Sequence, residues 1–499
     1  MLLFLELVAQ LPHVACAPIR PLRRKTALRV LSKLVAEDAG GVAISMDIGG
    51  TLAKVMLFQP RAAPPPDGEK PRLELGDAYL DAALAQSGER ELSMYVPALK
   101  GNLHFFVFES RHVAAAMALV KCRPAWRRQF VLRATGGGSY KHASELQRAD
   151  GHVLDDDASI VTGLNFLLHH TSEECFQVRV QDYSPLTAPA AYRQFVRNYC
   201  AVASPPDEYL YCSVGHGVSI LEVRGGRADG VTRYCKRGYS CIGGSTFWGL
   251  VCLLTSCSTF DEVIRLTESG SSSRVDMLVG DIYGGDCPAM GLGGDVIAAS
   301  MGKVAMQRAE TRALGPKFLL RYLGALLRHW EECFWLVVLA VVNSVPGTLM
   351  SWLSTLAAER AASAAMSGSL FYGARCHAHD VALSLLRMVS NNIGHIACLH
   401  AQQHGLKQIV FGGSFLRDHP YTIATISSAV HFFGRGEVEA VFLQHDGFVG
   451  AIGAHLTGTA VGGHVERVAG DYDGRMSLHP VAVPPVQTAK TETRDQKSP

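Results

Sequence analysis

The chain has 499 residues, of which 48% are hydrophobic, so it is long enough for two domains with a substantial core. Its 47 basic and 45 acidic side chains give a net charge of +2, which excludes the strong positive field of a protein built to bind nucleic acid. The 13 cysteines follow no metal-ligand or disulfide spacing, so we expect reduced thiols and a cytoplasmic protein.

Residues 1–40 are predicted to form an N-terminal extension. An apolar run comes first and a basic cluster from Arg20 to Arg29 follows, which reverses the order found in a secretory signal peptide. Because Glu6 is the only acidic residue before Glu37, a mitochondrial presequence is the alternative interpretation of this segment.

The first folded elements are predicted at residues 42–58, with the sequence VAISMDIGGTLAKVMLF. Two apolar strands flank a tight turn at Gly49 and Gly50, where the missing Cβ lets the backbone bend and approach a ligand. Backbone N–H groups in such a turn, with Thr51 beside them, can hold phosphate oxygens, and the carboxylate of Asp47 can hold Mg²⁺ or its waters. An ordinary hairpin with a Gly-Gly turn is the alternative interpretation.

Strands and helices alternate along the rest of the chain, which predicts an α/β architecture. After a proline-rich loop at 59–71, strands are expected at 102–109, 130–135, 209–223, 408–413 and 439–444, and helices at 111–121, 186–200, from 246 onward and at 380–405. We expect an N-terminal α/β lobe at 41–230 with the phosphate loop, a C-terminal α/β lobe at 231–465, and a disordered tail at 466–499.

A helical insertion in the second lobe is predicted at 307–375, where the sequence is rich in Ala and Leu. Within it, residues 333–358 carry no charged side chain and are long enough to span a bilayer. Polar and helix-breaking residues interrupt this run at Asn343, Ser344, Pro346 and Gly347, so two shorter buried helices explain it as well. Membrane association through this segment is an alternative that we do not favour.

Four further glycine-rich sites follow predicted strands, at 134–138 (ATGGG), 213–219 (SVGHGVS), 242–246 (IGGST) and 410–417 (VFGGSFLR). Each alone predicts only a tight turn, but five such sites in one chain suggest that several loops converge on one polyanionic ligand. The Walker sequence is absent, since the Gly302-Lys303 pair is followed by Val304 and lacks the upstream glycine, which excludes a P-loop protein.

Together the motifs give the chain a specific resemblance to a known family. The matching stretches are MDIGGTLAKVMLFQP at 46–60, KGNLHFFVF at 100–108, RATGGGSYK at 133–141, GHGVSIL at 215–221, IGGSTFWGLVCLLT at 242–255, DIYGGDCPAMGL at 281–292, SNNIGHIA at 390–397, VFGGSFLR at 410–417 and FLQHDGFVGAIGAHL at 442–456. In this order they resemble the eukaryotic-type (type II) pantothenate kinases of the acetate-kinase, sugar-kinase, Hsp70 and actin superfamily. The resemblance implies an actin-like, ribonuclease-H-like two-lobed kinase fold with a helical insertion.

The resemblance also implies ATP- and Mg²⁺-dependent phosphorylation of the primary hydroxyl of pantothenate, a step of coenzyme A biosynthesis. It assigns Asp47 to Mg²⁺ and to catalysis. It assigns the nucleotide to Gly49, Gly50, Thr51, Lys54, Gly215, Gly217, Gly412, Gly413 and Ser414, and pantothenate to Lys236, Arg237 and Ser219. Members of the family are homodimers inhibited by acyl-CoA thioesters, so both features are expected here.

Several positions depart from the family pattern. Ala143 stands where the family has a Glu that acts as general base, and Glu145 is the nearby carboxylate that could replace it. Lys236 stands where the family has an Arg that binds pantothenate, with Arg237 beside it, and His216 replaces a Ser. Two hypotheses follow: an active kinase that uses Glu145, or a catalytically weak pseudokinase that binds nucleotide or acyl-CoA.

Overall fold

The structure is a computed structural model that describes residues 43–66, 70–71, 92–121, 131–171, 174–178, 197–199, 206–225, 230–306, 376–416, 419–457, 459 and 461–468. The predicted extension at 1–40, the predicted insertion at 307–375 with its apolar run at 333–358, and the tail beyond residue 468 lie outside the described residues. In the part of the chain that is described, no helix combines the length and apolarity that a membrane crossing requires.

The first sheet has six strands in the order β3-β4-β2-β1-β5-β6. Their bounds are β1 Ala43–Ile48, β2 Leu52–Pro60, β3 Met94–Val96, β4 Gly101–Glu109, β5 Val131–Thr135 and β6 Gly151–Val153. β2 runs antiparallel to both β1 and β4, whereas β5 runs parallel to both β1 and β6. The strands predicted at both ends of 42–58, at 102–109 and at 130–135 are therefore confirmed.

The second sheet has eight strands in the order β16-β11-β10-β9-β14-β15-β7-β8. Their bounds are β7 Cys175–Val178, β8 Arg197–Tyr199, β9 Glu208–Val214, β10 Val218–Arg224, β11 Val231–Ser240, β14 Gln408–Gly412, β15 Glu439–Leu443 and β16 His464–Arg467. β10 runs antiparallel to β9 and β11, and β14 runs parallel to β9 and β15. A small third sheet pairs β12 (Met277–Leu278) with β13 (Ile297–Ala299).

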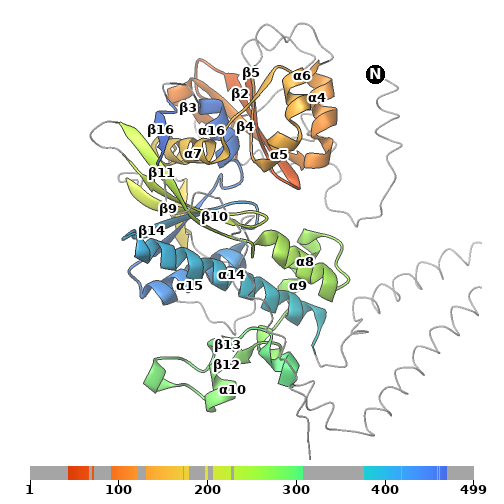
Figure 1. Ribbon diagram of the computed structural model, residues 1–499, viewed down its shortest axis with the longest axis vertical. Helices are drawn as coiled ribbons and strands as arrows, with labels where there is room; N and C mark the ends of the chain where they lie inside the picture. The colour runs from red at the N-terminus through yellow and green to blue at the C-terminus, as the bar shows by residue number, and fades with distance from the viewer. Residues whose placement is uncertain are drawn as a thin grey trace, which may run out of the picture.

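Five strands of each sheet repeat one arrangement, and Figure 1 shows the first sheet above the second. The orders β4-β2-β1-β5-β6 and β11-β10-β9-β14-β15 each join three antiparallel strands to two parallel ones. This is the ribonuclease-H-like unit in two copies, so the strand topology confirms the expected two-lobed, actin-like α/β fold.

Two predicted boundaries are wrong. The division between residues 230 and 231 falls inside the second sheet, because β9 and β10 form hydrogen-bonded ladders with the strands of that sheet and not of the first. The predicted start of the disordered tail at residue 466 is also wrong, because β16 pairs with β11 as far as Arg467.

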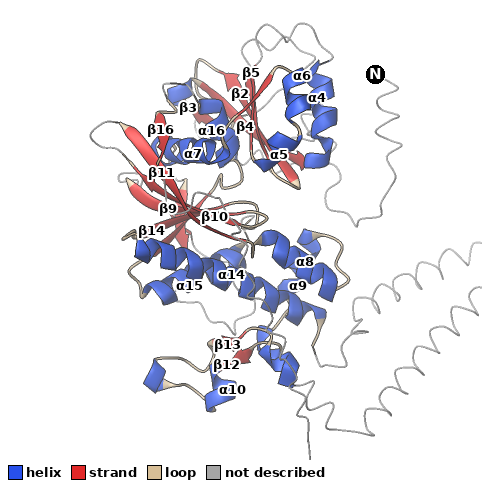
Figure 2. Ribbon diagram, in the orientation of Figure 1, coloured by secondary structure: helices blue, strands red, loops and turns tan. Residues whose placement is uncertain are grey.

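The helices are α4 Val113–Lys121, α5 Gly137–Lys141, α6 Ala143–Arg148, α7 Asp156–His170, α8 Gly244–Leu254, α9 Phe260–Thr267, α10 Val279–Tyr283, α14 Ala378–Gln403, α15 Pro420–Gly434 and α16 Val449–Leu456. α14 packs against α15 beside the second sheet, and α8 and α9 pack on α14 (Figure 2). α4, α8 and α14 confirm three predicted helices. The helix predicted at 186–200 is wrong where it is described, because Arg197–Tyr199 forms β8.

α7 and α16 follow the last strand of each copy and pack against each other, and one hydrophobic cluster joins both helices to strands of both sheets. Their backbones approach closely where two glycines meet the facing helix. A Cβ at Gly163 would lie 2.1 Å from the carbonyl oxygen of Val449, and one at Gly453 would lie 1.6 Å from that of Ser159. Only residues without a Cβ fit this crossing, which fixes how the two lobes meet.

Candidate functional site

The first loop that is predicted to hold phosphate is the turn between β1 and β2. The hairpin register pairs Asp47 with Lys54, so residues 49–51 form the connection. The hydroxyl of Ser110 donates a hydrogen bond to the carbonyl oxygen of Gly49 (2.6 Å), which holds the turn against the end of β4. The ammonium group of Lys54 lies 3.4 Å from the carboxylate of Asp47. The structure therefore brings the predicted metal ligand and the predicted cation together at this loop.

Two more glycines crowd Asp47 from other elements. Gly136, in the turn between β5 and α5, has a φ of +85°, and a Cβ there would lie 2.5 Å from the Oδ1 atom of Asp47. On α16, a Cβ at Gly450 would lie 3.2 Å from the Cγ atom of Asp47. The glycine-rich site at 134–138 thus lies against the first predicted phosphate loop, and a side chain at Gly136 would collide with the carboxylate of Asp47.

The second loop that is predicted to hold phosphate is the turn of residues 215–217 between β9 and β10, and it touches the first loop. The Nε2 atom of His216 shares a hydrogen bond with the hydroxyl of Thr51 (2.9 Å). The imidazole also lies over Gly50, where an added Cβ would meet its Cε1 and Nε2 atoms at 2.9 Å. His216 therefore bridges the two lobes at the loops predicted to hold phosphates.

The remaining two glycine-rich sites dock on this second loop. The N–H of Gly244 donates to the carbonyl oxygen of Gly215 (3.0 Å), and the N–H of Phe415 donates to that of Val214 (3.1 Å). Gly413 has a φ of +112°, and a Cβ there would lie 2.5 Å from the oxygen of Val214. All five glycine-rich sites are contiguous, as the sequence predicted, while the nucleotide contacts assigned to Gly412, Gly413 and Ser414 stay predictions.

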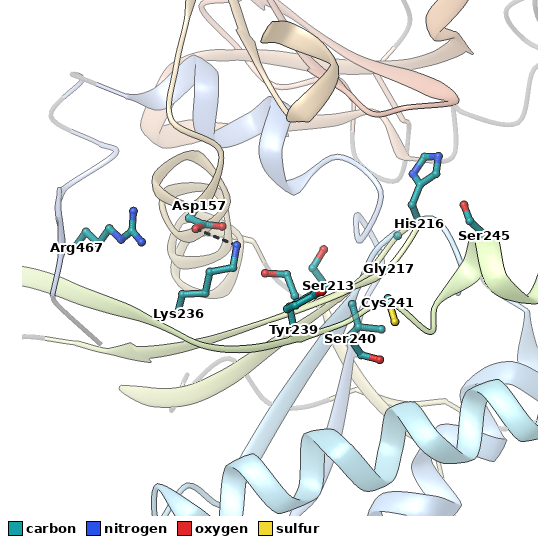
Figure 3. A pocket seen from close by; sticks show the side chains of 13 residues that line it. Asp157, Ser213, His216, Gly217, Lys236, Tyr239, Ser240, Cys241, Ser245 and Arg467 are labelled. Carbon is teal, nitrogen blue, oxygen red and sulfur yellow. Dashed lines mark ion pairs between the residues drawn. The ribbon is translucent and has the colours of Figure 1, made fainter. Parts of the chain in front are cut away.

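A cavity of about 810 Å³ opens beside the second loop (Figure 3). Its lining includes Gly215, His216, Gly217, Ser219, Lys236 and Arg467. The hydroxyl oxygen of Ser219 is buried and has no hydrogen-bond partner among the described residues. Because a buried hydroxyl is normally paired, this wall presents a polar atom that a ligand can satisfy. Predicted phosphate and pantothenate residues thus share one cavity.

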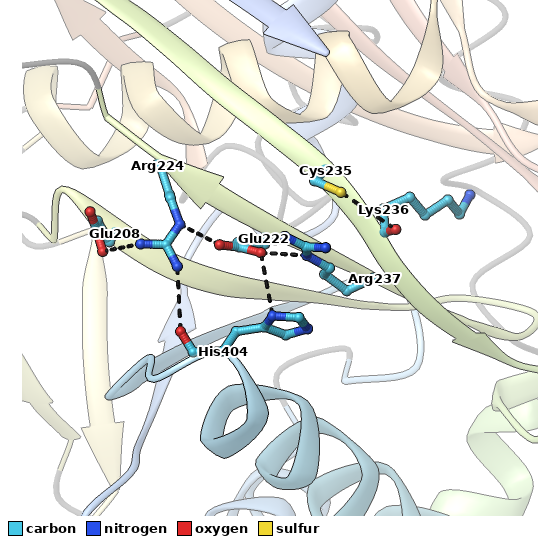
Figure 4. A network of polar contacts seen from close by, with 7 residues as sticks. All are labelled: Glu208, Glu222, Arg224, Cys235, Lys236, Arg237 and His404. Carbon is cyan, nitrogen blue, oxygen red and sulfur yellow. Dashed lines mark hydrogen bonds and ion pairs between the residues drawn. The ribbon is translucent and has the colours of Figure 1, made fainter. Parts of the chain in front are cut away.

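Lys236 and Arg237 point to different sides of β11. Lys236 lines the cavity and forms an ion pair with Asp157 on α7 (3.7 Å), as Figure 3 shows. Arg237 instead donates to the buried carboxylate of Glu222 (Figure 4). The register between β10 and β11 shifts after Ile220, which makes Arg237 the extra residue of a bulge. The structure does not bring Arg237 to the cavity, so it cannot take the place of Lys236 there.

Glu222 is the centre of the polar network in Figure 4. Its carboxylate accepts hydrogen bonds from Arg224 and Arg237, and the imidazole of His404 lies 3.8 Å away. Burial raises the pKa of Glu222, but the hydrogen bonds from the two guanidinium groups outweigh it, so the net pKa is lowered. This network ties α14 to the sheet and has a structural role.

Asp156, at the start of α7, is a candidate that the sequence reasoning missed. The hydroxyl of Thr135 donates a hydrogen bond to its Oδ1 atom (3.4 Å). Burial, and then the charges of Asp47 and Asp157, raise the pKa of Asp156 from 3.8 to about 7. A carboxyl group that titrates near neutrality beside Asp47 can accept a proton. The run of three aspartates at 155–157 before a helix was the available signal.

Glu145 is the general base that the sequence predicts. It belongs to the short helix α6, which begins at Ala143, and its carboxylate accepts a hydrogen bond from the hydroxyl of Ser144 (2.9 Å). That hydrogen bond lowers the pKa of Glu145. The role of Glu145 as the general base stays a prediction.

The residues around Asp47 fit Mg²⁺ better than a metal that needs a full protein cage. Within the described ranges, no group of three or more His, Cys, Asp or Glu side chains is arranged to hold a metal ion. Mg²⁺ keeps several waters and is usually held by one or two carboxylates together with substrate phosphates. One carboxylate at Asp47, which is 19% exposed and lies beside two glycine turns, matches that requirement.

The fold and the site define a two-lobed, actin-like α/β protein in which glycine loops from both lobes meet beside one cavity. The family profile described as Fumble matches residues 43–457, and the chain belongs to this family, which is that of the pantothenate kinases.

The chain is similar to several curated relatives. It is 31% identical to "Pantothenate kinase 2" of Arabidopsis thaliana, a match covering 83% of this chain and 38% of the relative. It is 30% identical to "4'-phosphopantetheine phosphatase" of Mus musculus, covering 83% and 40%. It is 31% identical to "Pantothenate kinase 1" of Arabidopsis thaliana, covering 82% and 84%. The chain thus spans well under half the length of the first two relatives.

Proposed function

We propose that the protein is an ATP-dependent pantothenate kinase, which transfers the γ-phosphoryl group of ATP to the primary hydroxyl of pantothenate. The product, 4'-phosphopantothenate, serves coenzyme A biosynthesis. The observation that carries the proposal is the contact between Thr51 and His216, which joins the glycine loops of the two lobes. Membership of the family and the names of two relatives support the same reaction.

On the donor side, phosphoryl transfer is mainly a matter of positioning and charge neutralisation. The N–H groups of residues 50–51 and 216–217 would hold phosphate oxygens, whereas those of Gly49 and Gly215 close the turns by donating to the carbonyl oxygens of Leu52 and Gly217. Asp47 would hold Mg²⁺, which neutralises phosphate charge when bound. Lys54, at 3.4 Å from Asp47, would add a second positive charge near the same phosphates.

On the acceptor side, Lys236 would pair with the carboxylate of pantothenate in the cavity, and the hydroxyl of Ser219 would hydrogen-bond to the same substrate. Two carboxylates are candidates for the general base. Glu145 is the sequence-based candidate, and Asp156 is the one that lies near Asp47.

The proposal is tested with the purified full chain, Mg-ATP and pantothenate, with 4'-phosphopantothenate detected by mass spectrometry. We expect product from the wild type and none above background from Asp47→Ala. Loss of a general base lowers turnover by about 10²–10⁴-fold, so comparing Glu145→Ala with Asp156→Asn identifies which carboxylate serves. A wild type that forms no more product than Asp47→Ala contradicts the proposal.

The pseudokinase hypothesis has its own signature in the same assay. A wild type that binds Mg-ATP but does not turn over, together with an Ala143→Glu variant that gains activity by orders of magnitude, would establish it. Robust wild-type turnover eliminates it.

Inhibition by an acyl-CoA thioester and assembly as a homodimer are part of the proposal because the resemblance implies them. Apolar side chains on the segment around α10, including Ile282, Tyr283 and Met290, are exposed in this chain and could pack against a second copy. Light scattering during gel filtration checks the dimer, and titration of the kinase assay with acyl-CoA checks the inhibition.

A further inference from the structure

β16 adds a charged residue to the cavity from outside the region shared with the family. The family match ends at residue 457. β16 covers His464–Arg467 and pairs in parallel with residues 231–234 of β11. Arg467, the last residue of this strand, lines the cavity together with Lys236 and Asp157. In Figure 3 its side chain extends toward those two residues.

The charge of Arg467 is not balanced by the other charged side chains that line the cavity. Lys236 is paired with Asp157 at 3.7 Å, so the two cations and one carboxylate give the lining a formal charge of +1. Arg467 makes no ion pair with any residue that the structure describes. Its neighbour Glu466 points to the other face of β16, where it pairs with Arg233 (3.8 Å). The cavity therefore matches a ligand that carries one negative charge.

The side chains around this charge suit a carboxylate. The guanidinium of an arginine presents two parallel N–H donors that match a carboxylate, whereas the ammonium of a lysine acts as a point charge. Lys236 alone, already shared with Asp157, would hold a carboxylate loosely. Ser219 adds a buried hydroxyl without a partner among the described residues in the same lining.

We propose that Arg467 is a substrate-binding residue that holds the carboxylate of pantothenate together with Lys236. This inference rests on the proposed function and adds a second residue that binds the carboxylate of the substrate. β16 then supplies the guanidinium group that β11 lacks at this cavity. Arg467 thereby favours acceptor substrates that carry a carboxylate over those that do not.

The test measures the affinity of the full chain for pantothenate by calorimetry, and its KM in the kinase assay, for the wild type and three variants. The variants are Arg467→Ala, Arg467→Lys and the control Arg233→Ala, which removes the same charge from the neighbouring strand but lies outside the cavity lining. Pantothenol, in which an alcohol replaces the carboxylate, is the second ligand.

We expect Arg467→Ala to weaken pantothenate binding about tenfold or more, as loss of a charge-assisted pair does, and Arg467→Lys to restore part of it. Pantothenol binding and the KM for ATP should not change. Thermal melting of each variant checks that the fold is intact.

If Arg467→Ala and Arg233→Ala bind pantothenate with equal affinity, the inference about Arg467 is wrong. If the wild type still turns over pantothenate in that case, the kinase proposal stands. A tenfold loss that extends equally to pantothenol also overturns it, because the contact would not be to the carboxylate. A wild type that neither binds nor phosphorylates pantothenate overturns both.

Discussion

Replacing Gly453 with alanine tests the packing that joins the two lobes. A Cβ at this position of α16 would lie 1.6 Å from the carbonyl oxygen of Ser159 on α7 and 2.6 Å from its carbonyl carbon. Ordinary van der Waals contact begins at 3.4 Å, so the two helices would have to separate by about 1.8 Å (3.4 − 1.6). Both obstacles are backbone atoms, which cannot rotate away as a side chain can.

Overpacking a tight core costs typically about 1–3 kcal/mol. A separation of the helices also loosens contacts of buried neighbours such as Leu164 and Ile452, so we expect Gly453→Ala to lower the free energy of unfolding by about 3–5 kcal/mol. Urea denaturation followed by circular dichroism measures this change. Binding of Mg-ATP should weaken as well, because Gly450 of the same helix lies against Asp47.

Gly249→Ala is the matched control. Gly249 lies on α8, and a Cβ there would meet no atom within 4 Å. Alanine should therefore be neutral or stabilise the protein by up to about 1 kcal/mol through helix propensity. A Gly453→Ala variant that unfolds within about 0.5 kcal/mol of the wild type, which is the range of a neutral surface change, would refute the argument from the helix crossing.

Three further variants probe the site. The pKa of Asp156 is raised from 3.8 to about 7 in the folded state, so the wild type loses stability as the pH rises from about 4 to 7. At pH 8 without Mg²⁺, Asp156→Asn should therefore be more stable than the wild type by up to about 4 kcal/mol. Equal changes in melting temperature between pH 5 and 8 for both proteins contradict this. His216→Ala removes the imidazole that lies over Gly50 and should weaken Mg-ATP binding about 2- to 10-fold in calorimetry, while an unchanged affinity would exclude a role at the phosphates. Glu222→Gln removes the negative charge that Arg224 and Arg237 share, and it should cost about 2 kcal/mol in urea denaturation; undiminished stability would mean that the network is dispensable.

The local parts of the fold could be predicted because they are written in short stretches of sequence. Two apolar runs around Gly49 and Gly50 specify the hairpin β1–β2, and the long amphipathic pattern of α14 specifies a helix. The repeated five-strand arrangement and the boundary between the lobes could not be predicted, because they depend on pairing between strands far apart in the chain, such as β9 with β14. β16 is short and mostly exposed, so only its pairing with β11 makes it a strand.

In the site, too, local features could be predicted from the sequence, whereas features that depend on long-range pairing could not. The glycine-rich sites were visible because each needs residues without a Cβ, and their convergence followed from their number. The direction of Arg237 was not visible, because it results from a bulge that only the pairing of β10 with β11 reveals. The raised pKa of Asp156 was equally hidden, since it depends on burial and on Asp47, which comes from another strand.

A structure of the protein with Mg²⁺ and a non-hydrolysable ATP analogue tests most directly whether the two loops form one nucleotide site. We predict density for the triphosphate between residues 49–51 and 215–217, with the metal ion next to Asp47 and the imidazole of His216 within hydrogen-bonding distance of a phosphate oxygen. Triphosphate density elsewhere on the protein, or no bound nucleotide at saturating concentration, would contradict the account.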